Sequence, residues 1–251
     1  MFNAGKIKND IVLWIRDYFE KNGCDCNVII GISGGKDSSV TAALCVQALG
    51  ASRVLGILLP QGEQRDIGFS YELVCLLGIK HITINIKDSV DAVLASLKDS
   101  GLSMNKQVTT NIPSRIRMSF LYAVATSVNG RVANTSNLSE DWVGYSTKFG
   151  STAGDFSPLS CLTSTEVKLV GRELLPSKLI DKIPEDGLSG LTDEENLGFT
   201  YDILDRYIRE GICEDAAIRE KIDMLHLLNK HKLMPMPCFS CTPAGGIELQ
   251  V

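Results

Sequence analysis

Residues 27–38 read Asn27-Val-Ile-Ile-Gly-Ile-Ser-Gly-Gly-Lys-Asp-Ser38 and give the clearest indication of the fold class. Residues 27–32 are rich in β-branched side chains, which is typical of a buried strand. Two adjacent glycines follow, and a helix is predicted from Ser38 to Leu49, with Gly50 behind it. A strand, a glycine-rich turn and a helix in this order indicate the start of a strand–helix–strand unit.

The same alternation of strands and helices continues along the chain. Further buried strands are predicted at 53–59, 81–86 and 131–135. Helices are predicted at 6–21, 67–77, 88–98, 113–128, 200–209 and 214–230, and after a capping box at 163–166. This alternation predicts an α/β fold: a Rossmann-like, doubly wound parallel sheet with helices on both faces. We expect residues 1–251 to form one domain.

The loops of such a fold indicate where a ligand binds. Sheets of this kind bind ligands beyond the carboxyl ends of the strands, where the strand order reverses. We therefore expect the loops after the first and the fourth strand to carry the chemistry. Residues 136–162 and the tail from Leu233 onward are predicted to be irregular. The polar stretches 99–110 and 182–198 are predicted to be loops and are our candidate lids.

The composition disfavours several classes of function. The chain has 251 residues, and its 25 basic and 30 acidic side chains give a net charge of −5. Such a charge is unsuited to coating nucleic acid or an anionic membrane. No apolar run approaches the ~20 residues of a membrane-spanning helix, and the N-terminus lacks the apolar stretch of a secretory signal. We expect a cytoplasmic protein with neither nucleic acid nor membrane as a partner.

The eight cysteines are expected to be reduced thiols in that compartment. Cys238 and Cys241 have the spacing of half a zinc site or of a redox pair. A second pair with that spacing is missing, because Cys24 and Cys26 stand too close together. A metal or redox role for Cys238 and Cys241 is therefore the less favoured hypothesis.

The glycine-rich turn has the features of a phosphate site. Gly34 and Gly35 let backbone N–H groups approach a ligand without a Cβ in the way. A helix start adds unpaired N–H donors and a partial positive charge, and Ser33 and Ser38 add hydroxyls. The alternative is a plain tight turn with Asp37 or Ser38 as the helix N-cap. Composition alone does not separate these two interpretations.

The spacing within the turn narrows the choice of phosphate loop. It is not a Walker A loop, because Gly31 stands one residue too close to Lys36, and it is not a dinucleotide fingerprint, because Ser33 replaces the second glycine. The turn resembles the S-G-G-x-D-S pyrophosphate loop of the ATP pyrophosphatases, which cleave ATP between the α- and β-phosphates. The resemblance implies an adenine-nucleotide alpha-hydrolase-like fold and a carboxylate, Asp37, that recruits Mg²⁺. Lys36 fills the variable position of the loop.

Five later segments indicate which member of this class the chain resembles. They are Asn111-Ile-Pro-Ser-Arg-Ile-Arg-Met118, Thr135-Ser-Asn-Leu-Ser-Glu140, Gly144-Tyr-Ser-Thr-Lys-Phe-Gly150, Asp155-Phe-Ser-Pro-Leu159 and Asp193-Glu-Glu-Asn-Leu-Gly198. In order and spacing they resemble the synthetase part of the NAD synthetase family. The resemblance covers the chain from the first helix to about Lys232.

The resemblance implies a role for individual residues. The ATP site would comprise Gly31, Ile32, Ser33, Gly34, Gly35, Lys36, Asp37, Ser38 and Thr135. Asp37 and Glu140 would hold Mg²⁺, which is the cofactor we expect. Deamido-NAD would be held by Arg115, Lys148, Asp155, His231 and Lys232. Two positions depart from the family pattern: Ser164 stands where a lysine is expected, and Glu185 where a threonine or serine is expected.

Taken singly, these residues have ordinary alternatives. Glu140 and Asp155 could also be solvent-exposed acids in loops and Lys148 an ordinary surface lysine. Arg115 could lie on the solvent-exposed face of a helix. Their joint occurrence in the family order favours the functional interpretation.

The expected function is a ligase that forms NAD from deamido-NAD and ammonia, with ATP cleaved to AMP and pyrophosphate through a nicotinate adenylate. No catalytic nucleophile on the protein is expected. Only one helix precedes the pyrophosphate loop, so we expect no glutaminase domain and free ammonia as the nitrogen donor. The family resemblance also implies a homodimer, with the helix that bears Arg115 at the interface. Two alternatives stay open: another pyrophosphate-loop enzyme that thiolates or amidates tRNA, and a nucleotide-binding module without catalysis.

Overall fold

A parallel sheet lies at the centre of the computed structural model, which describes residues 2–181 and 192–239. Its strands are β1 (Asn27–Gly31), β2 (Val54–Leu58), β3 (Lys80–Thr83) and β4 (Gly130–Val132). They pair in the order β3-β2-β1-β4, and every pairing is parallel. The chain steps outward from β1 to β3 and then returns to the other side of β1. The strand order therefore reverses between β1 and β4, which is where a ligand site is expected.

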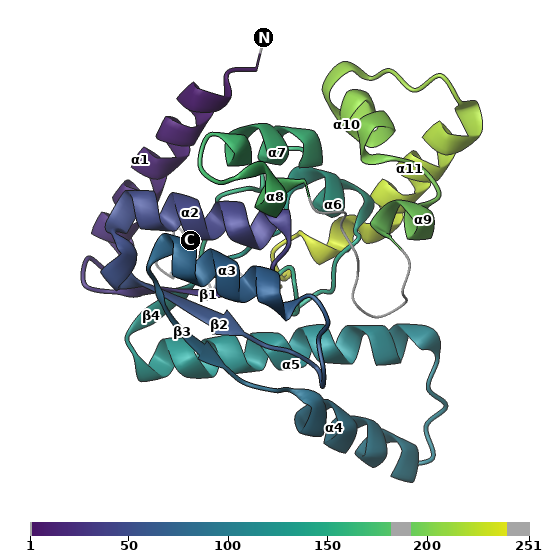
Figure 1. Ribbon diagram of the computed structural model, residues 1–251. Helices are drawn as coiled ribbons and strands as arrows, with labels where there is room; N and C mark the ends of the chain where they lie inside the picture. The colour runs from purple at the N-terminus through teal and green to yellow at the C-terminus, as the bar shows by residue number, and fades with distance from the viewer. Residues whose placement is uncertain (1, 182–191, 240–251) are drawn as a thin grey trace, which may run out of the picture.

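The helices connect and cover these strands (Figure 1). They are α1 (Ala4–Asn22), α2 (Lys36–Leu49), α3 (Ile67–Leu77), α4 (Lys87–Asp99), α5 (Lys106–Ser127), α6 (Leu138–Val143), α7 (Ser164–Arg172), α8 (Ser177–Ile180), α9 (Asp193–Leu197), α10 (Tyr201–Glu210) and α11 (Ala216–Asn229). Two 3₁₀ turns, Ala51–Arg53 and Lys230–Lys232, complete the elements. Helices α1, α2 and α3 lie on one side of the sheet and α4 and α5 on the other (Figure 1).

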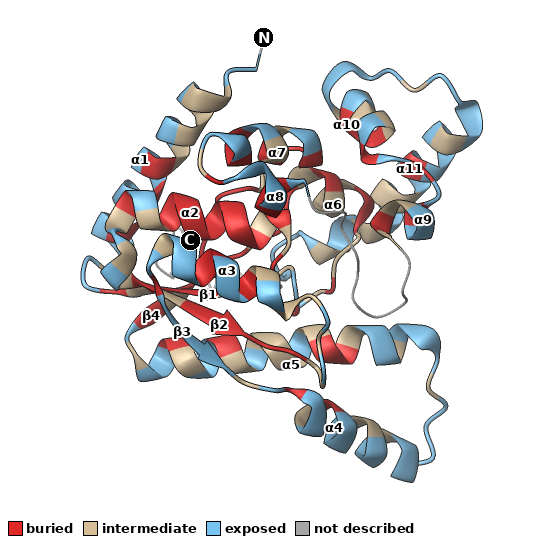
Figure 2. Ribbon diagram, viewed as in Figure 1, coloured by how far each residue is buried: buried red, intermediate tan, exposed pale blue. Residues whose placement is uncertain are grey.

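Alternation along β1 explains the two layers. Val28 and Ile30 pack in the core that contains residues of α1 and α2, whereas Ile29, on the opposite face, packs in the core that contains residues of α4 and α5. Helix α2 is buried along most of its length, as Figure 2 shows. Because successive strand residues point to opposite faces, one apolar run supplies both cores. The predicted doubly wound α/β fold is confirmed.

A third apolar cluster stands apart from the sheet and joins α6, α9, α10 and α11. Its buried members include Val143, Leu197, Leu204 and Ile222. This cluster packs the last helices of the chain against the short helix α6, which follows β4. It therefore fixes the position of the loop after β4.

Three parts of the predicted irregular regions are helical instead. Helix α5 begins at Lys106 rather than near Pro113, because the Asn105 side chain accepts a hydrogen bond from the Val108 N–H and Pro113 is buried inside the helix. Helix α6 interrupts the predicted loop at 136–162, and α9 occupies 193–197. The prediction of a loop at 99–110 was therefore wrong for residues 106–110. The other predicted lid lies largely outside the described residues.

Across the ranges 2–181 and 192–239, we find no helix with the length and apolar character needed to cross a bilayer.

Candidate active site

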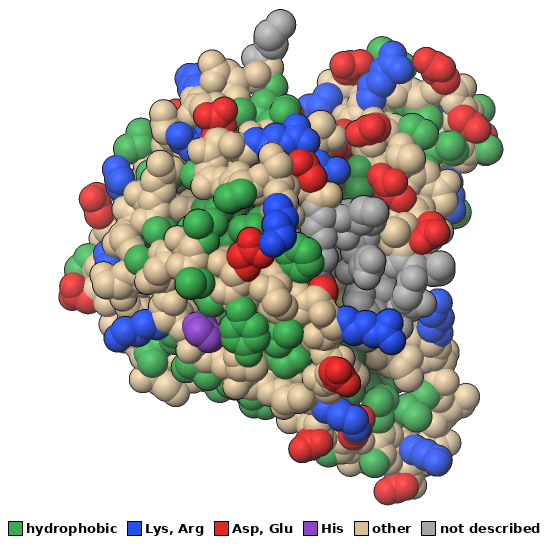
Figure 3. All heavy atoms as spheres, in the orientation of Figure 1, with side chains coloured by type: hydrophobic (Ala, Val, Ile, Leu, Met, Phe, Trp, Pro, Cys, Tyr) green, Lys and Arg blue, Asp and Glu red, His purple; other side chains and the backbone are tan. Residues whose placement is uncertain are grey.

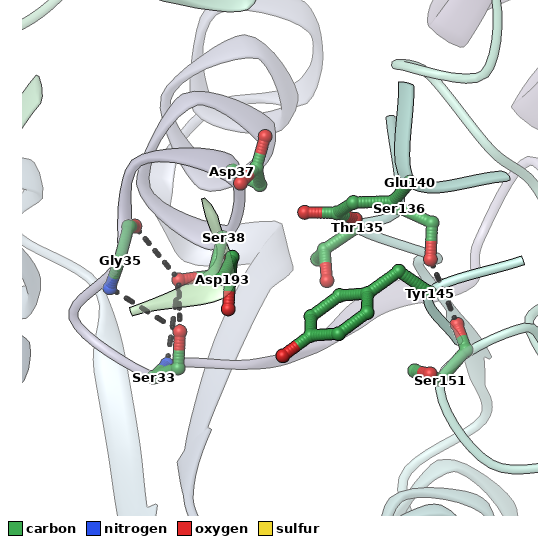
Figure 4. Close-up of a pocket in the computed structure, with 10 residues that line it drawn as sticks. All are labelled: Ser33, Gly35, Asp37, Ser38, Thr135, Ser136, Glu140, Tyr145, Ser151 and Asp193. Atoms are coloured by element: carbon green, nitrogen blue, oxygen red, sulfur yellow. Dashed lines mark hydrogen bonds between the residues drawn. The ribbon is translucent and has the colours of Figure 1, made fainter. Parts of the chain in front are cut away.

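A polar cavity of about 210 Å³ opens at the point where the strand order reverses. The residues that line it are Ser33, Gly35, Asp37, Ser38, Thr135, Ser136, Glu140, Tyr145, Ser151 and Asp193. Figure 4 shows the residues of the loop after β1 on one side and those of the loop after β4 on the other. The prediction that these two loops meet therefore agrees with the geometry.

The glycine-rich turn is tied together by its own hydroxyl groups. The Ser33 and Ser38 Oγ atoms lie 3.0 Å apart, and the Gly35 N–H donates to Ser33 Oγ at 3.2 Å. Ser38 Oγ also donates to the Gly35 carbonyl at 3.1 Å. Helix α2 begins at Lys36 with Gly35 as its N-cap, and no described side chain caps it. The alternative in which Asp37 or Ser38 is the N-cap was therefore wrong, and the uncapped helix start faces the cavity as an anion site would require.

Gly34 is required by the shape of this turn. Its φ of +79° lies in the left-handed region, and a Cβ there would meet Ser70 Oγ at 3.0 Å and the Ser70 backbone nitrogen at 3.2 Å. A side chain at this position is thus opposed by both backbone conformation and space.

Replacing Gly34 with Ala is expected to lower the free energy of unfolding by about 1–2 kcal/mol and to weaken ATP binding, because the turn must open to make room. Denaturant unfolding and ATP titration measure the two effects. Gly68→Ala in α3 is the matched control, since a Cβ there meets nothing within 4 Å. Equal ATP affinity in the Gly34 variant and the control would contradict this account.

Asn137 joins the two sides of the cavity. Its Nδ2 donates to Asp37 Oδ1 at 3.0 Å, although the two residues stand 100 positions apart. Its Oδ1 accepts from the N–H groups of Ser139 and Glu140, and the Asn137 N–H donates to the Glu140 carboxylate, which completes a capping box for α6. The fully buried Asn137 thereby orients both predicted metal-binding carboxylates.

Asp37 and Glu140 enter the cavity from opposite sides (Figure 4). Burial raises the pKa of the Glu140 carboxyl well above its usual range, and the charges of Asp37 and Asp193 raise it further. Lys36 opposes this rise. Carboxylates that face one another across a cavity bind a cation readily, because a cation offsets their repulsion.

Asp37 and Glu140 suit Mg²⁺ better than a metal ion whose ligands all come from protein side chains. No cluster of three or more His, Cys, Asp or Glu side chains that could hold a metal occurs within the described part of the chain. Mg²⁺ is usually held by one or two carboxylates together with water and substrate phosphates. Asp37 and Glu140, beside a phosphate-type loop, match this pattern.

Four of the five residues predicted to hold the dinucleotide form one connected group. Arg115 Nε on α5 donates to the Lys148 carbonyl at 3.2 Å, and Lys148 Nζ donates to the His231 carbonyl at 2.9 Å. Lys232 Nζ donates to the carbonyls of Gly144 and Ser146. These residues hold the segment from Gly144 to Lys148, which also supplies Tyr145 to the cavity.

Asp155 lies apart from this group, beside the edge strand β4. Its carboxylate accepts from the Val132 N–H at 2.7 Å and from the Tyr122 hydroxyl at 3.3 Å. Burial and Asp155 raise the pKa of Tyr122 to about 12, so this hydroxyl stays a donor. In this structure Asp155 ties α5 to β4 and does not line the cavity, and its predicted contact with substrate remains a prediction.

The other residues predicted for the ATP site differ in where they lie. Thr135 lines the cavity, whereas Gly31, Ile32 and Lys36 do not. Gly31 ends β1, the Ile32 N–H donates to the Ile57 carbonyl, and the buried Lys36 side chain donates to Asp37. Ser164 is fully buried, and its Oγ has no hydrogen-bond partner among the described residues. Glu185 and Cys241 lie outside the described residues, and Cys238 is an exposed free thiol.

Five functional candidates were not predicted individually. They are Ser136, Asn137, Tyr145, Ser151 and Asp193. The spacing of Asn137 and Glu140 is a capping-box signature that could have indicated helix α6 and its cap. The others reach the cavity through tertiary packing, for which no local pattern exists.

Comparison with known proteins places the chain in a family. The family model described as NAD synthase matches residues 7–234. The chain belongs to the NAD synthase family. It is 39% identical to the NH₃-dependent NAD⁺ synthetase of Pyrococcus furiosus over 81% of this chain and 82% of that protein. The family pattern therefore extends over both loops that form the cavity.

Solved structures agree with this membership. The NMN synthetase of Francisella tularensis superposes with a TM-score of 0.86 and 33% identity, covering 97% of this chain and 99% of that one. The NAD⁺ synthetase of Burkholderia pseudomallei superposes with a TM-score of 0.77 and 30% identity, covering 92% and 90%. Members with two different product names thus share this fold over nearly their whole length.

Proposed function

We propose that this chain is an ammonia-dependent NAD synthetase, a ligase that amidates the nicotinate carboxyl of deamido-NAD and cleaves ATP to AMP and pyrophosphate. One observation carries the proposal: the phosphate-type loop after β1 and the carboxylates Asp37 and Glu140 face a single cavity in a chain of the NAD synthase family. Relatives across that family carry the name NH₃-dependent NAD⁺ synthetase, which supports this activity.

The chemistry explains why ATP is consumed. A carboxylate is a poor electrophile, because ammonia would have to displace oxide. In the first step a carboxylate oxygen of the nicotinate attacks the α-phosphorus, the bond to the β-phosphate oxygen breaks, and pyrophosphate leaves. In the second step ammonia attacks the acyl carbon of the adenylate, AMP leaves with the C–O bond electrons, and the nitrogen loses a proton. The first step gives the acyl carbon a good leaving group, AMP, and the second step uses it, so the protein needs to supply positioning and charge rather than a nucleophile.

The residues of the cavity have separable tasks in this scheme. The turn at Ser33, Gly35 and Ser38 would hold the phosphates that depart as pyrophosphate, and Thr135 would contact the nucleotide from the other side. Asp37 and Glu140 would hold Mg²⁺, which supplies positive charge where negative charge accumulates during transfer. Asn137 fixes the orientation of both carboxylates through its side chain and backbone.

The acceptor would bind on the Arg115, Lys148, His231 and Lys232 group, beside Tyr145 of the cavity. Arg115 and Lys148 supply cationic groups suited to the phosphates of a dinucleotide. We also propose free ammonia as the nitrogen donor, in keeping with the name of the Pyrococcus furiosus relative.

Lys148→Met is expected to raise the KM for the acceptor by roughly 10- to 150-fold, because one charge-assisted contact to phosphate is worth about 1.5–3 kcal/mol. The KM for ATP should change little, since Lys148 does not line the cavity of the glycine-rich turn. Steady-state kinetics with each substrate varied in turn separate the two constants. A rise confined to the KM for ATP would argue against the assigned acceptor site.

A second candidate acceptor deserves a direct test. The Francisella tularensis neighbour is named NMN synthetase and has a higher TM-score than the Burkholderia pseudomallei NAD⁺ synthetase. Nicotinate mononucleotide carries the same nicotinate carboxyl as deamido-NAD and lacks the adenylate half. Incubation with ATP, Mg²⁺ and ammonium plus either acceptor, with NAD, NMN and pyrophosphate measured, decides between them. Failure to form either amide would refute the proposed function.

The other two alternatives receive less support. On the face drawn in Figure 3, basic and acidic side chains are interspersed, which is unlike the continuous basic stripe that binds tRNA. A nucleotide-binding module without catalysis would not need two oriented carboxylates beside its phosphate loop. Pyrophosphate release that depends on a nicotinate acceptor would exclude both alternatives.

We further propose a homodimer that works in the cytoplasm. The expected interface contains α5, the helix that bears Arg115. Exposed apolar side chains on α11 and just after it, including Met224, Leu227, Leu228 and Met236, supply further surface that a second copy could bury. The described cysteines are free thiols, which suits a reducing compartment. Light scattering during gel filtration gives the mass of the assembly, and a monomer at micromolar concentration would contradict the dimer.

A further inference from the structure

Lys36, which the family resemblance placed in the ATP site, is a buried cation that does not line the cavity, and the proposed chemistry gives it no separate task. Its side chain is 2% exposed, and its Nζ donates to Asp37 Oδ2 at 2.7 Å. The same ammonium lies 5.6 Å from the ring centroid of Tyr201. Glu140 and Asp193 are close enough for their charges to act on it.

A charged lysine is energetically unfavourable at this position unless neighbouring carboxylates stabilise it. Lys36 is the first residue of α2, where the helix dipole already contributes positive charge, and a cation there is disfavoured. Burial removes most of its hydration as well. The ammonium therefore depends on the carboxylates around it, and those carboxylates depend on the ammonium.

The side chains that line the cavity carry an excess of negative charge. Three carboxylates, those of Asp37, Glu140 and Asp193, line the cavity, and no lysine or arginine is among its described lining residues. Lys36, which is hydrogen-bonded to Asp37, supplies positive charge at the place where a divalent cation would act. An ammonium and a metal ion that depend on the same carboxylates compete electrostatically.

We propose that Lys36 is a resident counter-ion of the Asp37–Glu140 pair, which keeps free divalent metal out of the empty site so that metal enters together with ATP. The inference rests on the proposed role of Asp37 and Glu140. The polyphosphate of ATP brings additional ligands for the metal and additional negative charge, which together overcome the repulsion from the ammonium. Lys36 thus acts on the order of binding and is not itself a catalytic residue.

The test is direct titration of Mn²⁺, as a spectroscopic substitute for Mg²⁺, into the nucleotide-free protein, with free Mn²⁺ followed by its electron paramagnetic resonance signal. Lys36→Met is expected to bind Mn²⁺ at least about tenfold more tightly than the unchanged protein, because a close like charge has been removed. Lys36→Gln provides a second neutral variant if the first does not fold, and Lys36→Arg should bind as weakly as the unchanged protein. Mn²⁺ affinity that is unchanged or lower in the folded neutral variant would overturn the proposal.

Two controls locate the effect. Lys178→Met removes an exposed lysine that pairs with Glu72, and Mn²⁺ binding should be unaffected. In Lys36→Met/Glu140→Gln the gain in affinity should disappear, and its persistence would place the metal elsewhere and overturn the proposal. Amide formation by the unchanged protein is assayed in parallel. If the unchanged protein is active but Lys36→Met shows no gain in Mn²⁺ affinity, only the counter-ion role of Lys36 is refuted. If Lys36→Met shows the gain but the unchanged protein forms no amide, only the proposed ligase activity is refuted.

Discussion

Glu140→Gln is expected to reduce the rate of ATP-dependent amide formation by roughly 10²- to 10³-fold, the usual cost of removing a preorganised electrostatic group from an active site. Glutamine has nearly the same size and can still serve in the capping box of α6, so the change removes the charge and little else. Asp37→Asn should have a comparable effect from the other side of the cavity. Pyrophosphate release at saturating substrates measures both.

The variant chosen as a control for this result is Glu210→Gln, which alters an exposed acid at the end of α10. Its rate should stay within a factor of about two, because Glu210 does not line the cavity and a surface substitution rarely changes the free energy of unfolding by more than about 0.5 kcal/mol. Raising the Mg²⁺ concentration should restore part of the activity of Glu140→Gln if the lost function is metal binding. Activity near the unchanged level in both Glu140→Gln and Asp37→Asn would remove the basis of the proposed mechanism.

Asn137→Ala is expected to destabilise the protein by about 2–4 kcal/mol, because it removes an N-cap and a buried hydrogen bond to a carboxylate together. Asn137 is fully buried, caps α6 and donates to Asp37. Asn137→Ser separates the two roles, since serine is a good N-cap whose side chain is too short to replace the amide contact with Asp37. We expect Asn137→Ser to recover much of the stability and little of the activity.

Urea unfolding and steady-state kinetics on the two Asn137 variants provide the measurements. If Asn137→Ser were as active as the unchanged protein, the hydrogen bond to Asp37 would have no part in orienting that carboxylate. If Asn137→Ala were as stable as the unchanged protein, the capping role would be wrong.

The sequence predicted those parts of the site that depend on local patterns. The run from Asn27 to Ile32 and the two glycines behind it require a strand and a turn through residue type alone. Because parallel strands place their carboxyl ends at one edge, strand–helix alternation then predicts that the loops after β1 and β4 meet. The observed strand order brings Asp37 and Glu140 to one cavity for this reason.

What the sequence did not predict depends on packing between distant segments. Pro113 favoured a helix start, yet tertiary burial and the Asn105 cap extend α5 by about two turns before it. Asp193 and Tyr145 reach the cavity because a cluster of apolar residues holds α9 and α6 together. The buried ammonium of Lys36 has no signature in a loop whose pattern leaves that position variable.

The shortness of β4 has a consequence for how this protein responds to heat. The strand comprises only Gly130–Val132, and its pairing with β1 holds the second half of the cavity in place. A brief strand at a sheet edge opens more readily than the core helices do. Catalytic activity should therefore be lost at a lower temperature than the helical signal in circular dichroism. Bound nucleotide should reduce the difference between these two temperatures, because it would contact both the loop after β1 and the loop after β4.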